Sequence, residues 1–109
     1  MTQPDFVEVS TIHRPGPGAV TVVKISGVNV ALFNVAGCLF AINDFCMRCG
    51  TSLAEGSITG SQVTCRKCGW RYDFTTGRLA HLPALMTDRF EVHVVDSQIL
   101  VATAPTVPH

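Results

Sequence analysis

The chain has 109 residues, the size of one domain that can bury a core without covalent staples. Eight Lys and Arg residues balance eight Asp and Glu residues, which excludes a broadly basic surface for nucleic acid or an anionic membrane. Every apolar run is shorter than the roughly 20 residues of a membrane-spanning helix, so we expect a soluble protein.

Short strands joined by tight turns are predicted near both ends of the chain. The strands, indicated by alternating or Val- and Ile-rich segments, cover residues 6–9, 19–25, 28–33, 38–42, 90–95 and 99–102. The turns between them fall at residues 26–27, 34–37 and 96–98. The Pro and Gly residues of 15–18 predict a loose loop. Since no helical periodicity extends over a dozen positions, the fold class is all-β.

An inserted functional lobe is predicted over residues 43–85, between the two groups of strands. This segment holds four of the five cysteines, five of the nine glycines, and the only Trp and Tyr. Residues 5–42 and 86–103 would form the base of one domain that spans residues 1–109. Residues 104–109, with two prolines, predict a loose tail.

The cysteines are expected to bind metal. The start of the chain lacks a basic segment followed by an apolar one, so we expect a reducing cytoplasm, where paired cysteines favour metal over disulfides. Two residues separate the cysteines of each pair and fifteen separate the pairs, which is typical of four-cysteine zinc sites. The four predicted ligands are Cys46, Cys49, Cys65 and Cys68. The fifth cysteine, Cys38, is expected to pack as a small hydrophobic residue where a strand begins.

Residues beside the two pairs support the same prediction. Gly50 and Gly69 each follow a pair directly and suit a tight turn, because glycine tolerates positive φ. Arg48 and Lys67 each stand inside a pair, where a cation lowers the pKa of a thiol and offsets the charge of a thiolate cluster. Buried free thiols remain an alternative. A redox-active pair would need a βαβ context, which this sequence does not offer.

The segment from residue 46 to residue 77 resembles the Rieske family, small β-proteins that hold a [2Fe–2S] cluster between two loops. The family's first loop reads C-x-H with a later Leu and Gly, matched here by Cys46, Leu53 and Gly56. Its second loop reads C-P-x-H-G-W-x-F-D with a later T-G, and residues 65–77 run parallel to it. Residues 82–84 resemble the proline loop that covers the cluster. The resemblance implies a Rieske-like β-sandwich or barrel.

The chain departs from this family at the ligands. Arg48 replaces the first cluster histidine, Cys68 replaces the second, and Cys49 is added one position after the first. In a standard Rieske site the two cysteines hold one iron and two histidines hold the other. None of the four histidines substitutes by motif; they are His13, His81, His93 and His109.

Three models of the site follow. Four thiolates could close around one ion, either a rubredoxin-like iron or a redox-silent zinc. They could instead hold an all-cysteine [2Fe–2S] cluster, with Cys46 and Cys65 in their family roles and Cys49 and Cys68 on the other iron. In the third model metal binding is vestigial, although the gain of a fourth thiol argues against it.

Aromatic residues flank the second cysteine pair. Tyr72 resembles a family position whose hydroxyl donates to a ligand sulfur. Trp70 stands where relatives of higher potential place a serine donor. Alternatively, the two aromatic residues simply alternate on a strand. Asp73, with the Thr-Gly that follows, is predicted to form a turn.

The resemblance implies a ferredoxin-like one-electron carrier that docks briefly on a reductase and an oxygenase-type acceptor. Met47, Arg48 and Lys67, with residues 82–83, would ring the exposed edge of the site. The alternatives are a zinc-stabilised structural or protein-interaction module, and an accessory domain like the nitrite reductase small subunit. Catalysis by this chain alone is not expected, because four thiolates leave no open metal position. We expect a monomer.

Overall fold

Ten strands and one short 3-10 helix make up the fold of the described residues. The computed structural model describes residues 5–9 and 15–106. The strands are β1 (Phe6–Val9), β2 (Val20–Ile25), β3 (Val28–Val35), β4 (Cys38–Asn43), β5 (Ser57–Thr59), β6 (Gln62–Thr64), β7 (Arg71–Asp73), β8 (Arg89–Phe90), β9 (Val92–Val95) and β10 (Gln98–Ala102). The 3-10 helix, η2, covers Leu53–Glu55. Within the described ranges no helix has the length and apolarity to cross a membrane.

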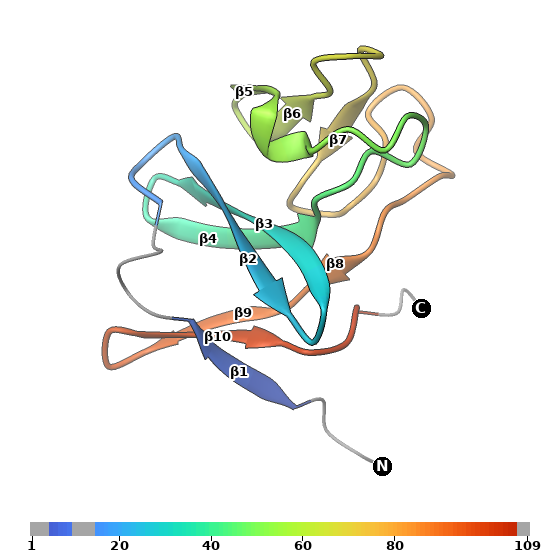
Figure 1. Cartoon of the computed structure of the whole chain (residues 1–109). Helices are drawn as coiled ribbons and strands as arrows, with labels where there is room; N and C mark the ends of the chain where they lie inside the picture. The colour runs from blue at the N-terminus through green and yellow to red at the C-terminus, as the bar shows by residue number, and fades with distance from the viewer. Residues whose placement is uncertain (1–4, 10–14, 107–109) are drawn as a thin grey trace.

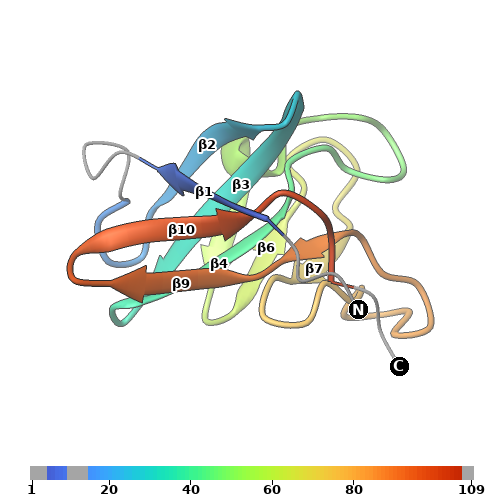
Figure 2. The same cartoon turned by 90° about the horizontal axis from the view of Figure 1, so that it is seen from below.

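The strands form three antiparallel sheets arranged as layers (Figure 1). The first sheet has the order β1-β10-β9, the second β2-β3-β4-β8, and the third β5-β6-β7. The second sheet lies in the middle, with the first sheet against one face and the third beyond the other (Figures 1 and 2). The prediction of an all-β fold is therefore confirmed.

Three hairpins are closed by two-residue turns in which both residues have positive φ. The turn residues are Ser26-Gly27 at 49° and 83°, Ala36-Gly37 at 52° and 90°, and Asp96-Ser97 at 49° and 67°. This pattern matches the type I′ turn, whose twist fits that of the two flanking strands. The three turns predicted from the sequence are confirmed.

The central strand β3 faces two hydrophobic clusters. Val30 and Leu32 point into a base cluster between the first and second sheets, whose buried members are Val9, Val23, Ile25, Val30, Leu32, Ala41, Phe90, Ile99 and Val101. Ala31 and Phe33 point into a lobe cluster on the opposite face, whose buried members are Ala31, Phe33, Ile42, Cys46, Leu53, Val63, Cys65, Tyr72, Phe74 and Leu79. Burial on both faces explains why residues 30–33 in the middle of β3 are all apolar.

Two strand predictions were incomplete. Residues 90–95 were predicted as one strand, but the chain changes sheets at Glu91, so β8 pairs with β4 while β9 pairs with β10. The three strands of the third sheet were not predicted, because each has only three residues and shows no alternation long enough to recognise.

Some segments differ from their sequence predictions. Cys38 is exposed rather than packed, because it opens β4 directly after a tight turn and belongs to neither cluster. Residues 15–18 are not loose: the carbonyl of Pro15 accepts a hydrogen bond from Asn34 Nδ2 at 2.8 Å. The predicted tail is attached at Thr106, whose N–H donates to the carbonyl of Arg89 at 2.6 Å. Residues 107–109 lie outside the described residues.

Candidate metal centre

The first cysteine pair lies in a tight loop that follows β4. The N–H of Cys46 donates to the carbonyl of Thr51 at 2.9 Å, and the N–H of Gly50 donates back to the carbonyl of Cys46 at 2.9 Å. Gly50 has a φ of 76°. The backbone therefore turns back within five residues, and both thiols of the pair project from the same loop.

The second pair repeats this geometry between β6 and β7. The N–H of Cys65 donates to the carbonyl of Trp70 at 2.8 Å, and the N–H of Gly69 donates to the carbonyl of Cys65 at 3.0 Å. Gly69 has a φ of 80°. The two cysteine loops, which are distant in sequence, thus have the same backbone conformation. The positive φ of Gly50 and Gly69 agrees with the prediction that both glycines allow a tight turn.

Replacing Gly50 by alanine should lower the free energy of unfolding by about 1–2 kcal/mol, because an L-residue is strained in the left-handed region. No heavy atom lies within 4 Å of the added Cβ, so the cost is conformational and not steric. Urea unfolding of the purified protein measures it. Gly16→Ala is the matched control, since Gly16 also has open space but no positive φ. Equal stability of the two variants would contradict the expectation.

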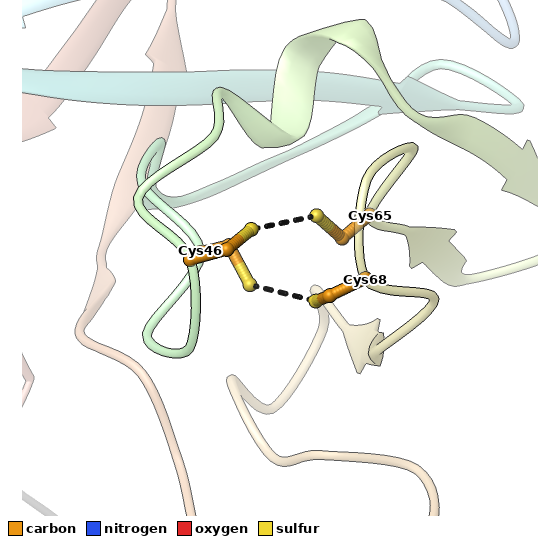
Figure 3. A group of neighbouring side chains, drawn as sticks. Cys46, Cys65 and Cys68 are labelled. Atoms are coloured by element: carbon orange, nitrogen blue, oxygen red, sulfur yellow. Dashed lines mark hydrogen bonds between the residues drawn. The ribbon is translucent and has the colours of Figure 1, made fainter.

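The four sulfur atoms of the two pairs converge between the loops. All four lie within 4.8 Å of one another. Two contacts cross between the loops, at 3.5 Å from Cys46 Sγ to Cys68 Sγ and 3.5 Å from Cys49 Sγ to Cys65 Sγ. Figure 3 shows the thiols of Cys46, Cys65 and Cys68 directed toward this common space. All five cysteines are free thiols.

The site is half-buried. Cys46 and Cys65 are 3% and 1% exposed and belong to the lobe cluster, whereas Cys49 and Cys68 are partly exposed. One side of the sulfur group is therefore part of the hydrophobic core, and the other side approaches solvent. This arrangement fixes two thiols rigidly and leaves an accessible edge.

Hydrogen bonds favour ionisation of two of the thiols. Burial opposes ionisation of Cys46, but hydrogen bonds from Tyr72 and from the backbone N–H groups of Cys49 and Arg48 outweigh it and lower the pKa of the thiol. Hydrogen bonds between Cys49 and the side chain and backbone of Thr51 lower the pKa of the Cys49 thiol to about 6. The shift favours the thiolate form of both groups, and it brings Cys49 to ionisation near neutral pH.

Cys68 behaves in the opposite way. Burial, together with its contacts to the other three thiols, raises the pKa of Cys68 to about 12. Four neighbouring thiolates repel one another, so without a cation the last of them stays protonated. A metal ion among the sulfurs would remove this conflict, and the donor set therefore fits a cation held by four thiolates.

The hydroxyl of Tyr72 contacts two residues of the first loop. Its side chain is fully buried, its hydroxyl lies 3.3 Å from Cys46 Sγ, and it accepts the N–H of Met47 at 2.9 Å. Burial and the contact with Cys46 raise the pKa of the phenol, so it remains protonated and can donate to the sulfur. This is the contact that the family resemblance predicted for Tyr72.

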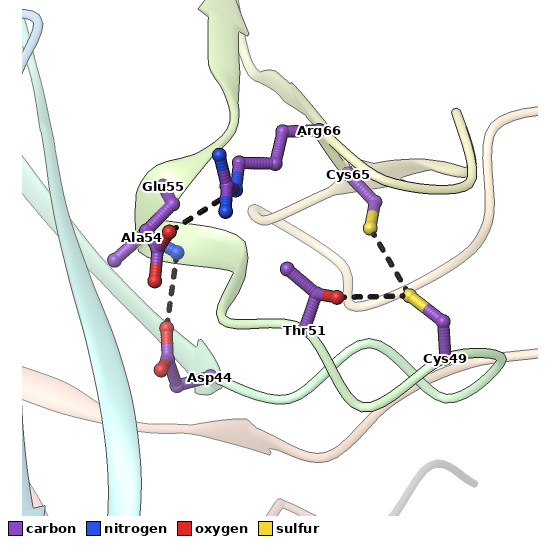
Figure 4. A network of polar contacts seen from close by, with 7 residues as sticks. All are labelled: Asp44, Cys49, Thr51, Ala54, Glu55, Cys65 and Arg66. Atoms are coloured by element: carbon purple, nitrogen blue, oxygen red, sulfur yellow. Dashed lines mark hydrogen bonds and ion pairs between the residues drawn. The ribbon is translucent and has the colours of Figure 1, made fainter.

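Two polar residues near the first loop were missed by the sequence reasoning. The Thr51 hydroxyl lies 3.3 Å from Cys49 Sγ, and the buried Asp44 carboxylate accepts the N–H of Ala54 at 3.0 Å (Figure 4). An exposed ion pair, Arg66 to Glu55 at 3.1 Å, links the second loop to η2. Thr and Asp are common in turns, so only their three-dimensional positions reveal these contacts.

Arg48 and His81 both contact the ring of Trp70. The guanidinium carbon of Arg48 lies 5.6 Å from the centre of the half-buried Trp70 ring, and the ring of His81 meets Trp70 edge-on at 5.6 Å. Lys67 is exposed. Arg48, which stands at a family histidine position, is therefore a cap on an aromatic ring and offers no metal-ligating atom.

The histidines do not join the sulfur group. Among the described residues, only the four cysteines form a cluster of metal-ligating side chains. His93 packs against the ring of Phe6 at 5.1 Å. His13 and His109 lie outside the described residues.

Asp73 forms a turn as predicted, since its carbonyl accepts the N–H of Gly77 at 2.7 Å.

Comparisons with known proteins found a matching family model and ferredoxin relatives. The family model described as Rieske [2Fe-2S] domain matches residues 5–105. The ferredoxin component of the naphthalene 1,2-dioxygenase/salicylate 5-hydroxylase systems of Ralstonia sp is 26% identical over 83 residues, covering 76% of this chain and 79% of the relative. The ferredoxin component of the naphthalene 1,2-dioxygenase system of Pseudomonas aeruginosa is 24% identical over 78 residues, covering 72% and 75%.

Solved structures show the same similarity in three dimensions. The ferredoxin of carbazole 1,9a-dioxygenase from Nocardioides aromaticivorans IC177 has a TM-score of 0.81 and 28% identity, covering 89% of this chain and 96% of that one. A chain in the complex of reduced oxygenase and oxidized ferredoxin in carbazole 1,9a-dioxygenase has a TM-score of 0.84 and 26% identity, covering 94% and 97%. The similarity therefore extends over nearly the whole of both chains.

Proposed function

Since the chain belongs to the Rieske [2Fe-2S] domain family, we propose that it is a ferredoxin-like one-electron carrier whose centre is held by four cysteines. The observation that carries the proposal is the convergence of four free thiols within 4.8 Å at the edge of a β scaffold. Iron bound by these thiolates would supply the one-electron chemistry. The proposed ligands are Cys46, Cys49, Cys65 and Cys68.

The residues around the thiols suit such a carrier. Two of the four sulfurs are buried in the lobe cluster, so a change in charge at the site would cause little rearrangement of the backbone. Tyr72 and Thr51 place hydroxyl groups against Cys46 and Cys49, respectively. Four thiolates would leave no position for a substrate on the metal, which supports electron transfer and not catalysis.

The surface beside the first loop supports brief docking of a partner. Four exposed apolar side chains belong to the cysteine loop or to residues 82–85: Phe45, Met47, Leu82 and Leu85. A hollow of about 310 Å³ beside the first loop is lined by Phe45, Cys46 and Met47 on one side and by residues 86–88 on the other. Arg48 and Lys67 add positive charge. Transient redox docking needs only such a small patch.

The names of the relatives suggest the class of partner. They are ferredoxin components of dioxygenase systems, and one solved structure is a complex of an oxygenase with a ferredoxin. We therefore propose a reductase as electron donor and an oxygenase-type protein as acceptor. A reducing cytoplasm would keep the four thiols available for metal, and the carrier would act as a monomer.

Reduction and reoxidation of the purified protein test this function. Protein made in iron-sufficient cells should absorb visible light, bleach on addition of dithionite, and recover its colour in air. A potentiometric redox titration with soluble mediators should show a single one-electron step. A colourless, zinc-loaded preparation from the same cells would contradict the proposal and favour a structural module.

Replacing Tyr72 by phenylalanine is expected to lower the reduction potential by about 40 mV. The hydroxyl donates to Cys46 Sγ, and this bond strengthens when the reduced site carries more negative charge. A differential bond energy of about 1 kcal/mol corresponds to about 40 mV for one electron. A redox titration measures the shift, with unchanged metal content as the control. An unchanged or higher potential would show that the hydroxyl does not donate to the site.

A further inference from the structure

We propose that the four cysteines close as a tetrahedron around a single metal ion, instead of the two-iron cluster named in the family description. This inference rests on the proposed function only in taking iron as the ion. Its evidence is the set of sulfur atoms that lie close together and the matched geometry of the two loops.

A histidine-ligated cluster does not fit the residues present. Such a cluster needs two imidazoles on one of its irons. The positions that the resemblance assigns to them hold Arg48, which caps the Trp70 ring, and Cys68. His81 packs edge-on against Trp70, and the metal-ligating group found among the described residues contains cysteines only.

An all-cysteine two-iron cluster disagrees with the sulfur contacts. It would leave Cys46 and Cys65 on one iron and Cys49 and Cys68 on the other. Thiolates on different irons are separated by the iron–iron distance as well as by their own bonds, so they stand farther apart than thiolates on one ion. In the structure both 3.5 Å contacts, from Cys46 to Cys68 and from Cys49 to Cys65, join sulfurs that this assignment would place on different irons, and no two of the four sulfurs lie more than 4.8 Å apart.

A single tetrahedral ion agrees with the same contacts. Metal–sulfur bonds of about 2.3 Å place the sulfurs of a tetrahedron about 3.8 Å apart. The two cross-loop contacts of 3.5 Å lie close to this value, and no pair of the four sulfurs is separated by more than 4.8 Å. The two loops have the same backbone hydrogen bonds and the same left-handed glycine, so each presents two thiols in the same way.

Metal and sulfide analysis of the purified protein tests the inference. The full chain is made in iron-sufficient cells and purified without oxygen in the presence of a thiol reductant. We expect one metal ion per chain, no acid-labile sulfide, and, if the ion is iron, the electron paramagnetic resonance of an isolated high-spin ferric ion after the reductant is removed and the protein is oxidised in air. Two irons and two sulfides per chain would overturn the inference.

Cobalt(II) supplies a second test that does not depend on the ion acquired in cells. Titration of the metal-free chain should saturate at one cobalt per chain, with the charge-transfer bands of tetrahedral thiolate coordination. Cys68→Ser should weaken binding at least tenfold, whereas the control Cys38→Ser, at an exposed cysteine outside the group, should not change it. Saturation at two cobalt ions, or the absence of charge-transfer bands, would overturn the inference.

The two proposals fail in different ways. A single zinc ion per chain would support the single-ion site and contradict the electron carrier. A two-iron cluster that bleaches reversibly would support the carrier and contradict the single-ion site.

Discussion

Replacing Cys49 by serine is expected to lower the affinity of the site for its metal by about 100-fold. Structural four-ligand zinc sites bind with about 10–16 kcal/mol, so each thiolate contributes about 3 kcal/mol. That contribution corresponds to about two powers of ten in the dissociation constant. Cys49 Sγ lies 3.5 Å from Cys65 Sγ and 3.3 Å from the Thr51 hydroxyl, so a serine would fill its place without a clash.

Competition with a chromophoric chelator measures this loss of affinity. The control is Cys38→Ser, which makes the same chemical change at an exposed cysteine outside the sulfur group. Its affinity and visible spectrum should equal those of the unchanged protein. If Cys49→Ser also keeps its metal content and spectrum, Cys49 is not a ligand and the site has at most three thiolates.

Removing the metal should lower the melting temperature by about 15 °C or more. A ligand that binds only the native state at 100 to 1,000 times its dissociation constant adds about 3–4 kcal/mol. For a domain of this size each kcal/mol corresponds to about 4–8 °C. The loss has a structural cause, since Cys46 and Cys65 belong to the lobe cluster and unneutralised thiolates would repel one another there.

Hydrogen exchange should locate this destabilisation. In the metal-free protein, the amides of Cys46, Gly50, Cys65 and Gly69, which form the loop hydrogen bonds, should lose most of their protection. The amides of β3, paired on both sides with β2 and β4, should keep theirs. Differential scanning calorimetry under reducing conditions measures the accompanying shift in melting temperature. Equal loss of protection in the loops and in β3 would show that the metal stabilises the whole domain uniformly.

The base of the fold could be predicted from the sequence because its information is local. Alternating residues and tight turns predict β2 to β4 and β10, and the observed strands agree with these predictions to within two residues at each end. The break at Glu91 could not be predicted, since a change of sheet depends on which strand lies alongside. The exposure of Cys38 could not be predicted either, since it depends on how the described segments pack around the start of β4.

The candidate site could be predicted in part. Spacing alone predicted which four cysteines converge, and the resemblance predicted the contact of Tyr72 with a cysteine sulfur. The cap of Arg48 on Trp70 and the hydroxyl of Thr51 against Cys49 could not be predicted, because both depend on how separate loops approach each other. Spacing also does not distinguish one ion from two irons, because Cys-x-x-Cys pairs serve both; the pattern of sulfur contacts carries that distinction.

The separation of the base cluster from the lobe cluster has an evolutionary consequence. The clusters lie on opposite faces of one sheet and, within residues 5–9 and 15–106, share no buried side chain, so a ligand substitution disturbs the lobe while the base keeps its own packing. A lineage could therefore pass through intermediates with a poor metal site that still fold. Histidine ligands could be exchanged for cysteines one mutation at a time, and a different metal centre could be selected while the base cluster stays unchanged.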